Sequence, residues 1–155
     1  MVSETELIER YFRPVSAARA DVVLGIGDDA ALLAVPPGEQ LVLTTDALVE
    51  GVHFLPGAHP CALGHRALAV NLSDIAAMGA VPAWMLLSLI MPEADEGWLG
   101  QFVEGLAGLA HSYDVALVGG NLSRGPLSIT ITLADRSRHR GRHRSAARGP
   151  AAGRR

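Results

Sequence analysis

Apolar residues recur at the helical period in three segments of the chain. In each segment the apolar positions lie three or four residues apart, which places them on one face of a helix. The second segment begins at a proline and is followed by Gly79, and both residues are typical of helix boundaries. The pattern therefore predicts helices over residues 4–12, 60–78 and 93–113.

Runs of aliphatic and β-branched residues between these helices predict strands. They cover residues 22–26, 41–43, 83–91, 115–118 and 127–133. A Pro-Pro-Gly turn signal separates the first two runs and predicts that they pair as a hairpin. The sequence GGNLSRGP separates the last two runs and is rich in turn-forming residues, so it is predicted to be a loop.

The regular pattern stops after Leu133, and charge divides the chain at the same point. Residues 1–133 hold 15 acidic residues and five arginines, for a net charge of −10, whereas residues 134–155 hold eight arginines and one aspartate, for a net charge of +7. The second part has no Leu, Ile, Val or aromatic residue from which to build a core. The sequence predicts one folded domain over 1–133 and a disordered, Arg-rich tail over 134–155.

Two interpretations of the tail remain open. A strand that ends in the middle of its pattern and continues as Arg/Ala/Gly/Pro-rich sequence is the expected product of a reading-frame shift in GC-rich DNA. The other interpretation is a basic tail that binds nucleic acid or another anionic surface. No aromatic residue lies among the arginines to stack on bases, which disfavours the second interpretation.

Several classes of protein are excluded by composition. Lysine is absent from the chain, which excludes a Schiff-base enzyme and a P-loop kinase. Cys61 is the only cysteine, so no intrachain disulfide forms. The first ten residues lack the basic and apolar regions of a signal peptide, and the apolar run 80–91 is too short to span a bilayer. These features predict a cytoplasmic protein without a membrane span.

Oxygen-bearing side chains recur at four places where the backbone is tight or the surroundings are apolar. The places are the two aspartates of Gly25–Ala31, the sequence Thr44-Thr45-Asp46, Asp74 in an apolar helix beside Asn71, and Gly120-Asn121 after a strand. Each has an ordinary structural explanation, because aspartates form turns, cap helices or meet water. Together, carboxylate, hydroxyl and amide oxygens are the ligands that suit Mg²⁺, and Mg²⁺ suits nucleotide phosphates.

The sequence GIGDDA at 25–30 also fits the glycine pattern of dinucleotide-binding folds, and Asp46 lies 21 residues beyond its first glycine, close to the usual spacing. Two features disfavour such a fold. Asp28 and Asp29 would place negative charge where the pyrophosphate lies. The Pro-Pro-Gly connection also leaves little room for a crossover helix.

Four motifs, in this order and at these separations, resemble those of the thiamine-monophosphate kinase family: GIGDDAALL, LVLTTDALVEGVHF, ALAVNLSDIAAMGA and LVGGNLSRGPLSITI. The resemblance covers Glu4 to Leu133. The family lies in a broader group with aminoimidazole ribonucleotide synthetase and selenophosphate synthetase. It implies an α+β fold with a four-stranded mixed sheet backed by helices, as in the N-terminal domain of aminoimidazole ribonucleotide synthetase. It also implies a homodimer of two paired sheets, with the nucleotide near the dimer interface.

The resemblance also implies roles for single residues. Magnesium ions around the ATP phosphates would be bound by Asp29, Thr44, Thr45, Asp46, Asp74 and Asn121; the nucleotide by Gly120 and Asn121; and thiamine phosphate by His53. Asp28 would serve mainly as a turn residue. Asp29, Asp46 and Asp74 are therefore expected to converge in the folded chain.

Two departures from the family affect this expectation. The family usually has Asp at the position of Asn121, whose amide oxygen can ligate a metal but carries no charge. The family's second domain, with its further contacts to nucleotide, metal and substrate, has no counterpart in this chain. The chain is therefore expected to be truncated and inactive by itself.

The implied reaction is in-line attack by a thiamine monophosphate oxygen on the γ-phosphorus of ATP, which gives thiamine diphosphate and ADP. Magnesium would reduce the repulsion between the two anions. One alternative is a non-catalytic fragment that dimerises or binds nucleotide. A second is a nucleic-acid-binding protein that uses the tail. A third is an enzyme of the selenophosphate synthetase or hydrogenase maturation type.

Overall fold

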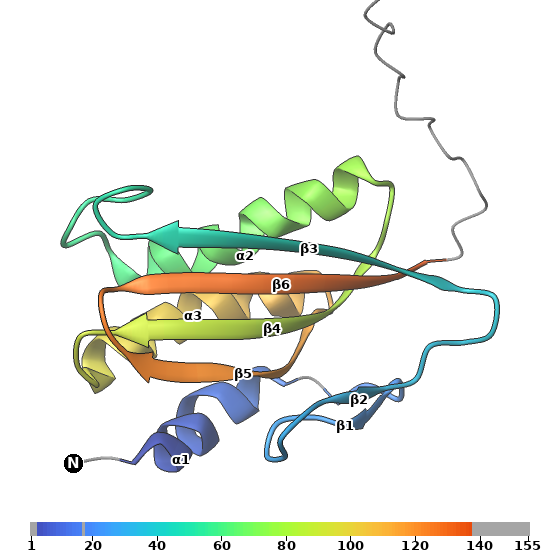
Figure 1. Ribbon diagram of the computed structural model, residues 1–155, viewed down its shortest axis with the longest axis horizontal. Helices are drawn as coiled ribbons and strands as arrows, with labels where there is room; N and C mark the ends of the chain where they lie inside the picture. Colours follow the sequence, from blue (N-terminus) through green and yellow to red (C-terminus); the bar gives the residue numbers. More distant parts are fainter. Residues whose placement is uncertain (1–2, 17, 138–155) are drawn as a thin grey trace, which may run out of the picture.

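The computed structural model describes residues 3–16 and 18–137. Its main element is a four-stranded sheet, with α2 (Pro60–Ala77) and α3 (Glu96–Ser112) on one face (Figure 1). The strands lie in the order β3 (Gln40–Val49), β6 (Ser128–Ser137), β4 (Pro82–Met91) and β5 (Ala116–Arg124). β4 and β5 are parallel, and the other two pairs are antiparallel. The predicted α+β class, with a four-stranded mixed sheet backed by helices, is confirmed.

The hydrophobic core lies between the sheet and the two helices. Every second residue of β4 from Met85 to Met91 is buried, and the same alternation runs from Ile129 to Leu133 in β6. This period of two places one row of side chains from each strand against α2 and α3. The helices in turn bury the apolar stripes that their sequences predict.

Glycines let α2 and α3 approach each other closely. A Cβ atom at Gly64 would lie 2.0 Å from the carbonyl oxygen of Phe102, and one at Gly105 would lie 1.9 Å from the carbonyl oxygen of Cys61. Such distances are far below a van der Waals contact, so this helix crossing requires glycine at both positions.

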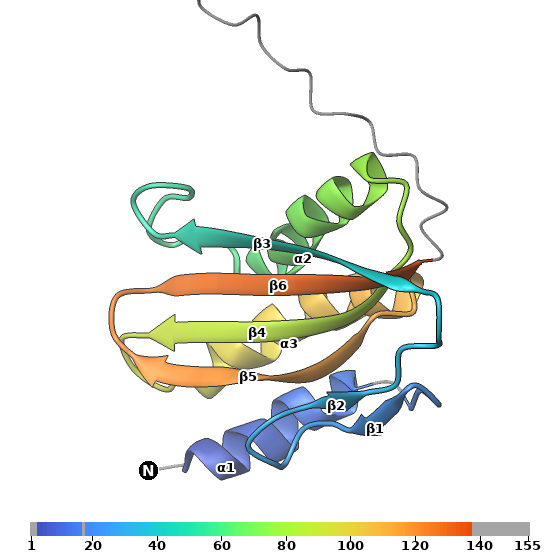
Figure 2. The same ribbon diagram turned by 45° about the vertical axis from the view of Figure 1, so that its right-hand side comes forward.

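The N-terminal segment forms a short helical rod beside β5 (Figure 2). Ser3 caps it, because its hydroxyl accepts a hydrogen bond from the Glu6 amide while the Glu6 carboxylate accepts one from the Ser3 amide. The rod consists of α1 (Glu4–Leu7), the π-helical turn η1 (Ile8–Phe12) and the 3-10 turn η2 (Arg13–Val15). We call residues 4–15 the N-terminal rod.

A small second sheet follows the N-terminal rod and consists of β1 (Val22–Leu24) and β2 (Leu32–Leu33). A buried ion pair fixes its position. Arg19 donates to both carboxylate oxygens of Asp21 at 2.9 Å, and Asp21 also accepts a hydrogen bond from Nε1 of Trp84 at 3.1 Å. The side chains of Arg19 and Asp21 are only 11% and 9% exposed. The hydrogen bond to Asp21 raises the pKa of Arg19, so this anchor stays charged.

The face of the sheet opposite the two helices is uncovered over much of its area. Leu41 and Leu43 of β3 and Leu86 of β4 are 45%, 64% and 43% exposed. Thr45 and Thr132 lie on the same face, and their hydroxyls are joined by a hydrogen bond of 3.0 Å. We call these five residues the open face. Exposed leucines on a paired sheet are typical of surfaces that bind another protein chain.

Several strand predictions are wrong, because strand pairing depends on distant segments. The predicted hairpin between the first two aliphatic runs does not form, since β1 pairs with β2 and β3 pairs with β6. β3 extends through residues 44–46, which were predicted to lie at the end of a strand. β5 extends through residues 119–124, which were predicted to lie in a loop. β6 continues to Ser137, beyond the predicted limit of 133, because its pairing with β3 continues there.

Two further predictions concern the whole chain. No helix among the described residues is long and apolar enough to cross a membrane. The tail was predicted to be disordered. Its residues 138–155 lie outside the described residues, so this prediction is not tested there.

Candidate functional site

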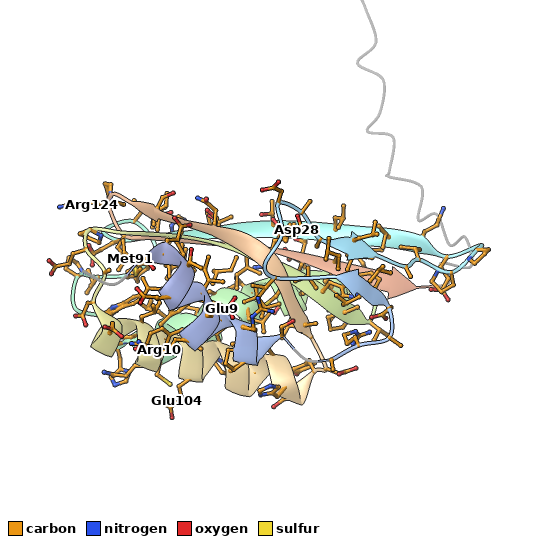
Figure 3. All side chains as sticks on the ribbon, turned by 90° about the horizontal axis from the view of Figure 1, so that it is seen from below. Glu9, Arg10, Asp28, Met91, Glu104 and Arg124 are labelled. Carbon is orange, nitrogen blue, oxygen red and sulfur yellow. The ribbon has the colours of Figure 1, made fainter. Side chains whose placement is uncertain are left out.

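A cavity of about 390 Å³ lies at the β5 edge of the sheet. Its walls are the N-terminal rod, the loop of residues 26–29 and residues 119–122 of β5. Three of the predicted site residues line it, namely Asp29, Gly120 and Asn121. Figure 3 shows the molecule from the side of the N-terminal rod, with Glu9 on the rod and Asp28 on the loop. We call this space the β5-edge cavity.

The loop at the β5-edge cavity is shaped by Gly27 and Asp28. Gly27 has a φ angle of +118°, which few other residues adopt, and a Cβ atom there would lie 2.8 Å from Nη2 of Arg13. Oδ1 of Asp28 accepts a hydrogen bond from the amide of Asp29 at 2.8 Å, which is the geometry of a turn residue. The exposed carboxylate of Asp29 makes no hydrogen bond or ion pair with the rest of the described chain. It is therefore available to a cation.

In the β5 wall of the cavity, Gly120 is needed for packing and Asn121 is a candidate ligand. A Cβ atom at Gly120 would lie 1.9 Å from the carbonyl oxygen of Leu87, so the pairing of β5 with β4 requires glycine there. The next residue, Asn121, is exposed and donates a hydrogen bond from Nδ2 to Oγ of Ser123 at 2.8 Å. Its Oδ1 atom is then the one that can bind a metal ion or a nucleotide.

A second group of predicted ligands lies on β3 and α2. Oγ1 of Thr44 donates to Oδ2 of Asp74 at 2.9 Å and so joins two motifs that are 30 residues apart. Asp46 follows Thr44 by two residues on the same strand and projects from the same face. Oδ1 of Asp46 accepts a hydrogen bond from the amide of Ala47 at 3.1 Å. The carboxylates of Asp46 and Asp74 are exposed. We call Thr44, Asp46 and Asp74 the β3–α2 group.

Thr45 and His53 lie apart from this group. Thr45 belongs to the open face, and its hydroxyl donates to the carbonyl oxygen of Ile131 at 3.2 Å. His53 lies in the turn after β3, where Nδ1 accepts a hydrogen bond from the amide of Val49 at 3.0 Å. Because Nδ1 is the acceptor, the neutral ring carries its proton on Nε2, and this exposed side chain can donate to a ligand.

The β5-edge cavity and the β3–α2 group do not converge within one chain, which corrects the expectation for Asp29, Asp46 and Asp74. They lie at opposite edges of the sheet, with β6 and β4 between them. Three strand spacings of about 4.8 Å separate the edges by roughly 14 Å. Among the described residues, no three His, Cys, Asp or Glu side chains are placed to hold a metal ion together. The physical reason is that β3 joins the sheet through β6, at the edge far from the loop of residues 26–29.

Each group nevertheless has donor atoms that fit magnesium. Mg²⁺ in nucleotide sites takes one or two protein carboxylates and completes its shell with phosphate oxygens and water. The β3–α2 group offers two exposed carboxylates and a hydroxyl, and the β5-edge cavity offers the carboxylate of Asp29 and the amide oxygen of Asn121. All of these atoms are hard oxygen donors, and further ligands from a nucleotide would complete either shell.

One charged pair at the β5-edge cavity was not predicted from the sequence. Arg13 donates to both carboxylate oxygens of Glu9, with 2.6 Å between Nη2 and Oε1, and both residues line the cavity. This hydrogen bonding lowers the pKa of Glu9 and raises the pKa of Arg13, so both side chains are charged at neutral pH. The four-residue spacing on a predicted helix would have indicated the pair, but not its position beside the loop.

The fold and the sequence together define a class of protein. Residues 27–134 match the family described as "AIR synthase related protein, N-terminal domain". This range contains the whole four-stranded sheet except the last residues of β6, both sheet-covering helices, and all of the predicted site residues. The chain belongs to this family.

Within the family, the chain is similar to thiamine-monophosphate kinases, which confirms the resemblance seen in the motifs. The thiamine-monophosphate kinase of Escherichia coli strain K12 is 54% identical over 130 residues, which are 84% of this chain and 40% of that protein. The crystal structure of thiamine-monophosphate kinase from Stenotrophomonas maltophilia K279a superposes with a TM-score of 0.78 and 48% identity, over 88% of this chain and 43% of that one.

A further solved structure carries ligands. AaThiL complexed with AMPPCP and TMP superposes with a TM-score of 0.63 and 35% identity, over 87% of this chain and 42% of that one. The chain thus spans about 40% of the length of the relatives that it matches.

Proposed function

We propose that this chain is the nucleotide- and metal-binding part of a kinase that transfers a phosphoryl group from ATP to thiamine monophosphate. The similarity to thiamine-monophosphate kinases supports the reaction, and the AMPPCP and TMP bound to AaThiL support the two substrates. The observation that carries the proposal is the 2.9 Å contact between Thr44 and Asp74. It places a hydroxyl and a carboxylate from two separate motifs together at the surface, where a Mg²⁺ ion with bound phosphates can reach both.

The two parts of the site would hold different parts of the reacting complex. In the β5-edge cavity, Asp29 and Asn121 would bind Mg²⁺ while Gly120 and Asn121 face the nucleotide. The β3–α2 group would bind Mg²⁺ at the other edge of the sheet through Thr44, Asp46 and Asp74. His53 would donate its Nε2 proton to the phosphate of thiamine monophosphate.

The reaction would be a direct transfer without a covalent enzyme intermediate. An oxygen of the thiamine monophosphate phosphate attacks the γ-phosphorus of ATP, the bond from that phosphorus to the β–γ bridging oxygen breaks, and ADP leaves. Bound Mg²⁺ supplies positive charge that offsets the repulsion between the two anions. The side chains of the chain itself position the substrates, and no lysine is available to share this role.

A homodimer would bring the two separated parts of the site together. The open face carries exposed leucines on β3 and β4, and a second copy of the chain that packs there would cover them. A twofold axis along the strands would set the β3 edge of one copy against the β5 edge of the other, so the strand that carries Thr44 and Asp46 would lie next to the partner's β5-edge cavity. Thr45 lies on the open face and would then stand at this junction.

Replacing Leu43 with aspartate is expected to weaken the dimer by about a hundredfold, because a buried charge would oppose the packing of two open faces. Leu43 is 64% exposed in the single chain. The measurement is the molar mass by light scattering across a range of protein concentrations. Leu55→Asp is the control, since Leu55 is 79% exposed in the loop after β3 and lies off the open face. A parent chain that remains monomeric at all concentrations would contradict the dimer.

Nucleotide binding is tested by calorimetric titration of the full chain with AMPPCP, with and without Mg²⁺. We expect binding that depends on Mg²⁺ and that weakens about tenfold in Asp29→Asn, because this change removes one charged metal ligand. Glu104→Gln serves as the control, since it removes an exposed carboxylate on α3 that does not line the cavity. Binding that is unaffected by Mg²⁺ and by Asp29→Asn would count against the proposal.

The alternatives predict different results in other experiments. A non-catalytic fragment would dimerise or bind nucleotide. It would not support phosphoryl transfer when it is joined to the part of a relative that this chain does not cover. A nucleic-acid-binding protein would bind DNA in a salt-sensitive manner and lose this binding on deletion of residues 134–155. The cytoplasmic location remains a prediction from the sequence.

A further inference from the structure

The β5-edge cavity has one positively charged side chain among its lining residues, that of Arg13. Three carboxylates line the same cavity, those of Glu9, Asp28 and Asp29. A nucleotide polyphosphate would add several more negative charges to this space. Since the chain has no lysine, Arg13 is the side chain that can offset part of this charge from within the cavity.

Arg13 lies directly against the loop that carries Asp29. Its Nη2 atom is 2.8 Å from the position that a Cβ atom on Gly27 would occupy, so glycine there leaves room for the guanidinium group. The loop then continues through Asp28 to Asp29 along the wall of the same cavity. The guanidinium group and the candidate metal ligand therefore border one space.

The present partner of Arg13 is easily replaced. The Arg13 and Glu9 side chains are 50% and 49% exposed, and an exposed ion pair at this spacing contributes little to stability. A phosphate group accepts the same pair of parallel hydrogen bonds from a guanidinium group and carries more negative charge than a carboxylate. When Arg13 leaves Glu9 for a phosphate, the protein therefore loses little stability, and the guanidinium group makes a stronger contact.

The other described arginines near the N-terminal rod are not placed for this role. Arg10 leaves the rod on the side of α3 and pairs with Glu96, as its position beside that helix in Figure 3 indicates. Arg19 is held by Asp21 and by Asp114. Neither residue lines the β5-edge cavity.

We infer that Arg13 exchanges its partner Glu9 for a phosphate of the nucleotide that binds in the β5-edge cavity. Glu9 holds the guanidinium group at the cavity wall before the nucleotide arrives and competes with the nucleotide for it. The inference rests on the proposed function for the presence of a nucleotide, and it adds a binding residue and an internal competitor. It predicts that loss of the Arg13 charge weakens nucleotide binding and that loss of the Glu9 charge strengthens it.

The experiment is calorimetric titration of the full chain with AMPPCP in the presence of Mg²⁺. Arg13→Gln is expected to weaken binding about tenfold, because a charged hydrogen-bonded contact to phosphate is lost. Glu9→Gln is expected to strengthen binding by about threefold, because the competitor loses its charge. The double variant is expected to bind like Arg13→Gln, since competition acts through Arg13, whereas direct repulsion between the Glu9 carboxylate and the phosphates would persist in the double variant. Arg10→Gln is the matched control and is expected to bind like the parent.

Each outcome bears on the inference separately from the proposed function. If the parent chain binds AMPPCP and Arg13→Gln binds it equally well, the inference is wrong and the nucleotide site stands. If Glu9→Gln weakens binding, or still has its effect in the double variant, the competition is wrong. Tighter binding by Glu9→Gln cannot come from misfolding, which protects the test against a merely structural effect. Failure of the parent and of Arg10→Gln to bind any AMPPCP overturns both proposals.

Discussion

Replacing Asp74 with alanine is expected to reduce phosphoryl transfer by about a thousandfold or more in a chimera that joins this chain to the rest of a relative. The chimera joins residues 1–133 to the remaining part of the Escherichia coli relative, which this chain does not cover. Asp74 supplies one of the two carboxylates of the β3–α2 group and receives the hydroxyl of Thr44. Its loss would leave the proposed metal site with one carboxylate at this edge of the sheet. The measurement is the rate of thiamine diphosphate formation from ATP and thiamine monophosphate.

The neighbouring Ser73 provides the matched control for this experiment. Its hydroxyl donates only to the carbonyl oxygen of Ala69 within the same helix, and the side chain is exposed. Ser73→Ala is therefore expected to keep the activity of the chimera. If Asp74→Ala retains activity within about tenfold of the chimera, the metal-binding role of Asp74 is wrong. An inactive unmodified chimera would favour the non-catalytic alternative.

Replacing Gly105 with alanine is expected to lower the free energy of unfolding by about 3 kcal/mol, which corresponds to a melting temperature lower by roughly 10 °C. The added Cβ atom would lie 1.9 Å from the carbonyl oxygen of Cys61, a backbone atom of α2 that cannot rotate away. The two helices would have to move apart, and the core beneath them would lose contacts. Denaturant unfolding of the full chain measures the effect.

Gly108 lies on the same helix and tests whether the effect comes from the close helix crossing. A Cβ atom at Gly108 has no neighbour within 4 Å, so Gly108→Ala is expected to stabilise the chain by up to about 1 kcal/mol through higher helix propensity. The two substitutions add the same methyl group and differ only in their surroundings. Similar effects at both positions would show that the crossing does not require glycine.

The helices were predictable from the sequence because their signals are local. α2 begins at Pro60 and α3 keeps the predicted apolar stripe, since period and boundary residues lie within each segment. The pairing of strands was not predictable, because the residues of β3 pair with residues of β6 that lie 79 to 97 positions later in the chain. The hairpin prediction failed for the same reason: a turn sequence shows that the chain reverses, but not which strand it meets.

The arrangement of the candidate site was not predictable from the sequence. The motifs indicate candidate oxygen ligands, but their chemistry contains no information on which edge of the sheet each occupies. The faces of Thr44 and Thr45 follow from the period of a strand. Adjacent strand residues point to opposite faces, so Thr44 contacts Asp74 while Thr45 lies on the open face. The role proposed for Arg13 depends on the closeness of its guanidinium group to the loop at Gly27, which no local pattern reveals.

The position of β6 has a consequence for how the protein is made. Among the described residues β6 is the last strand along the chain, but it lies between β3 and β4 and supplies a partner for both. While the ribosome is still synthesising residues 128–137, the nascent chain holds β3 without a neighbour and β4 with one open edge. Such edges pair readily with other chains. Correct pairing of β3 and β4 therefore waits until β6 has emerged, and protection of the earlier strands by a chaperone should raise the yield.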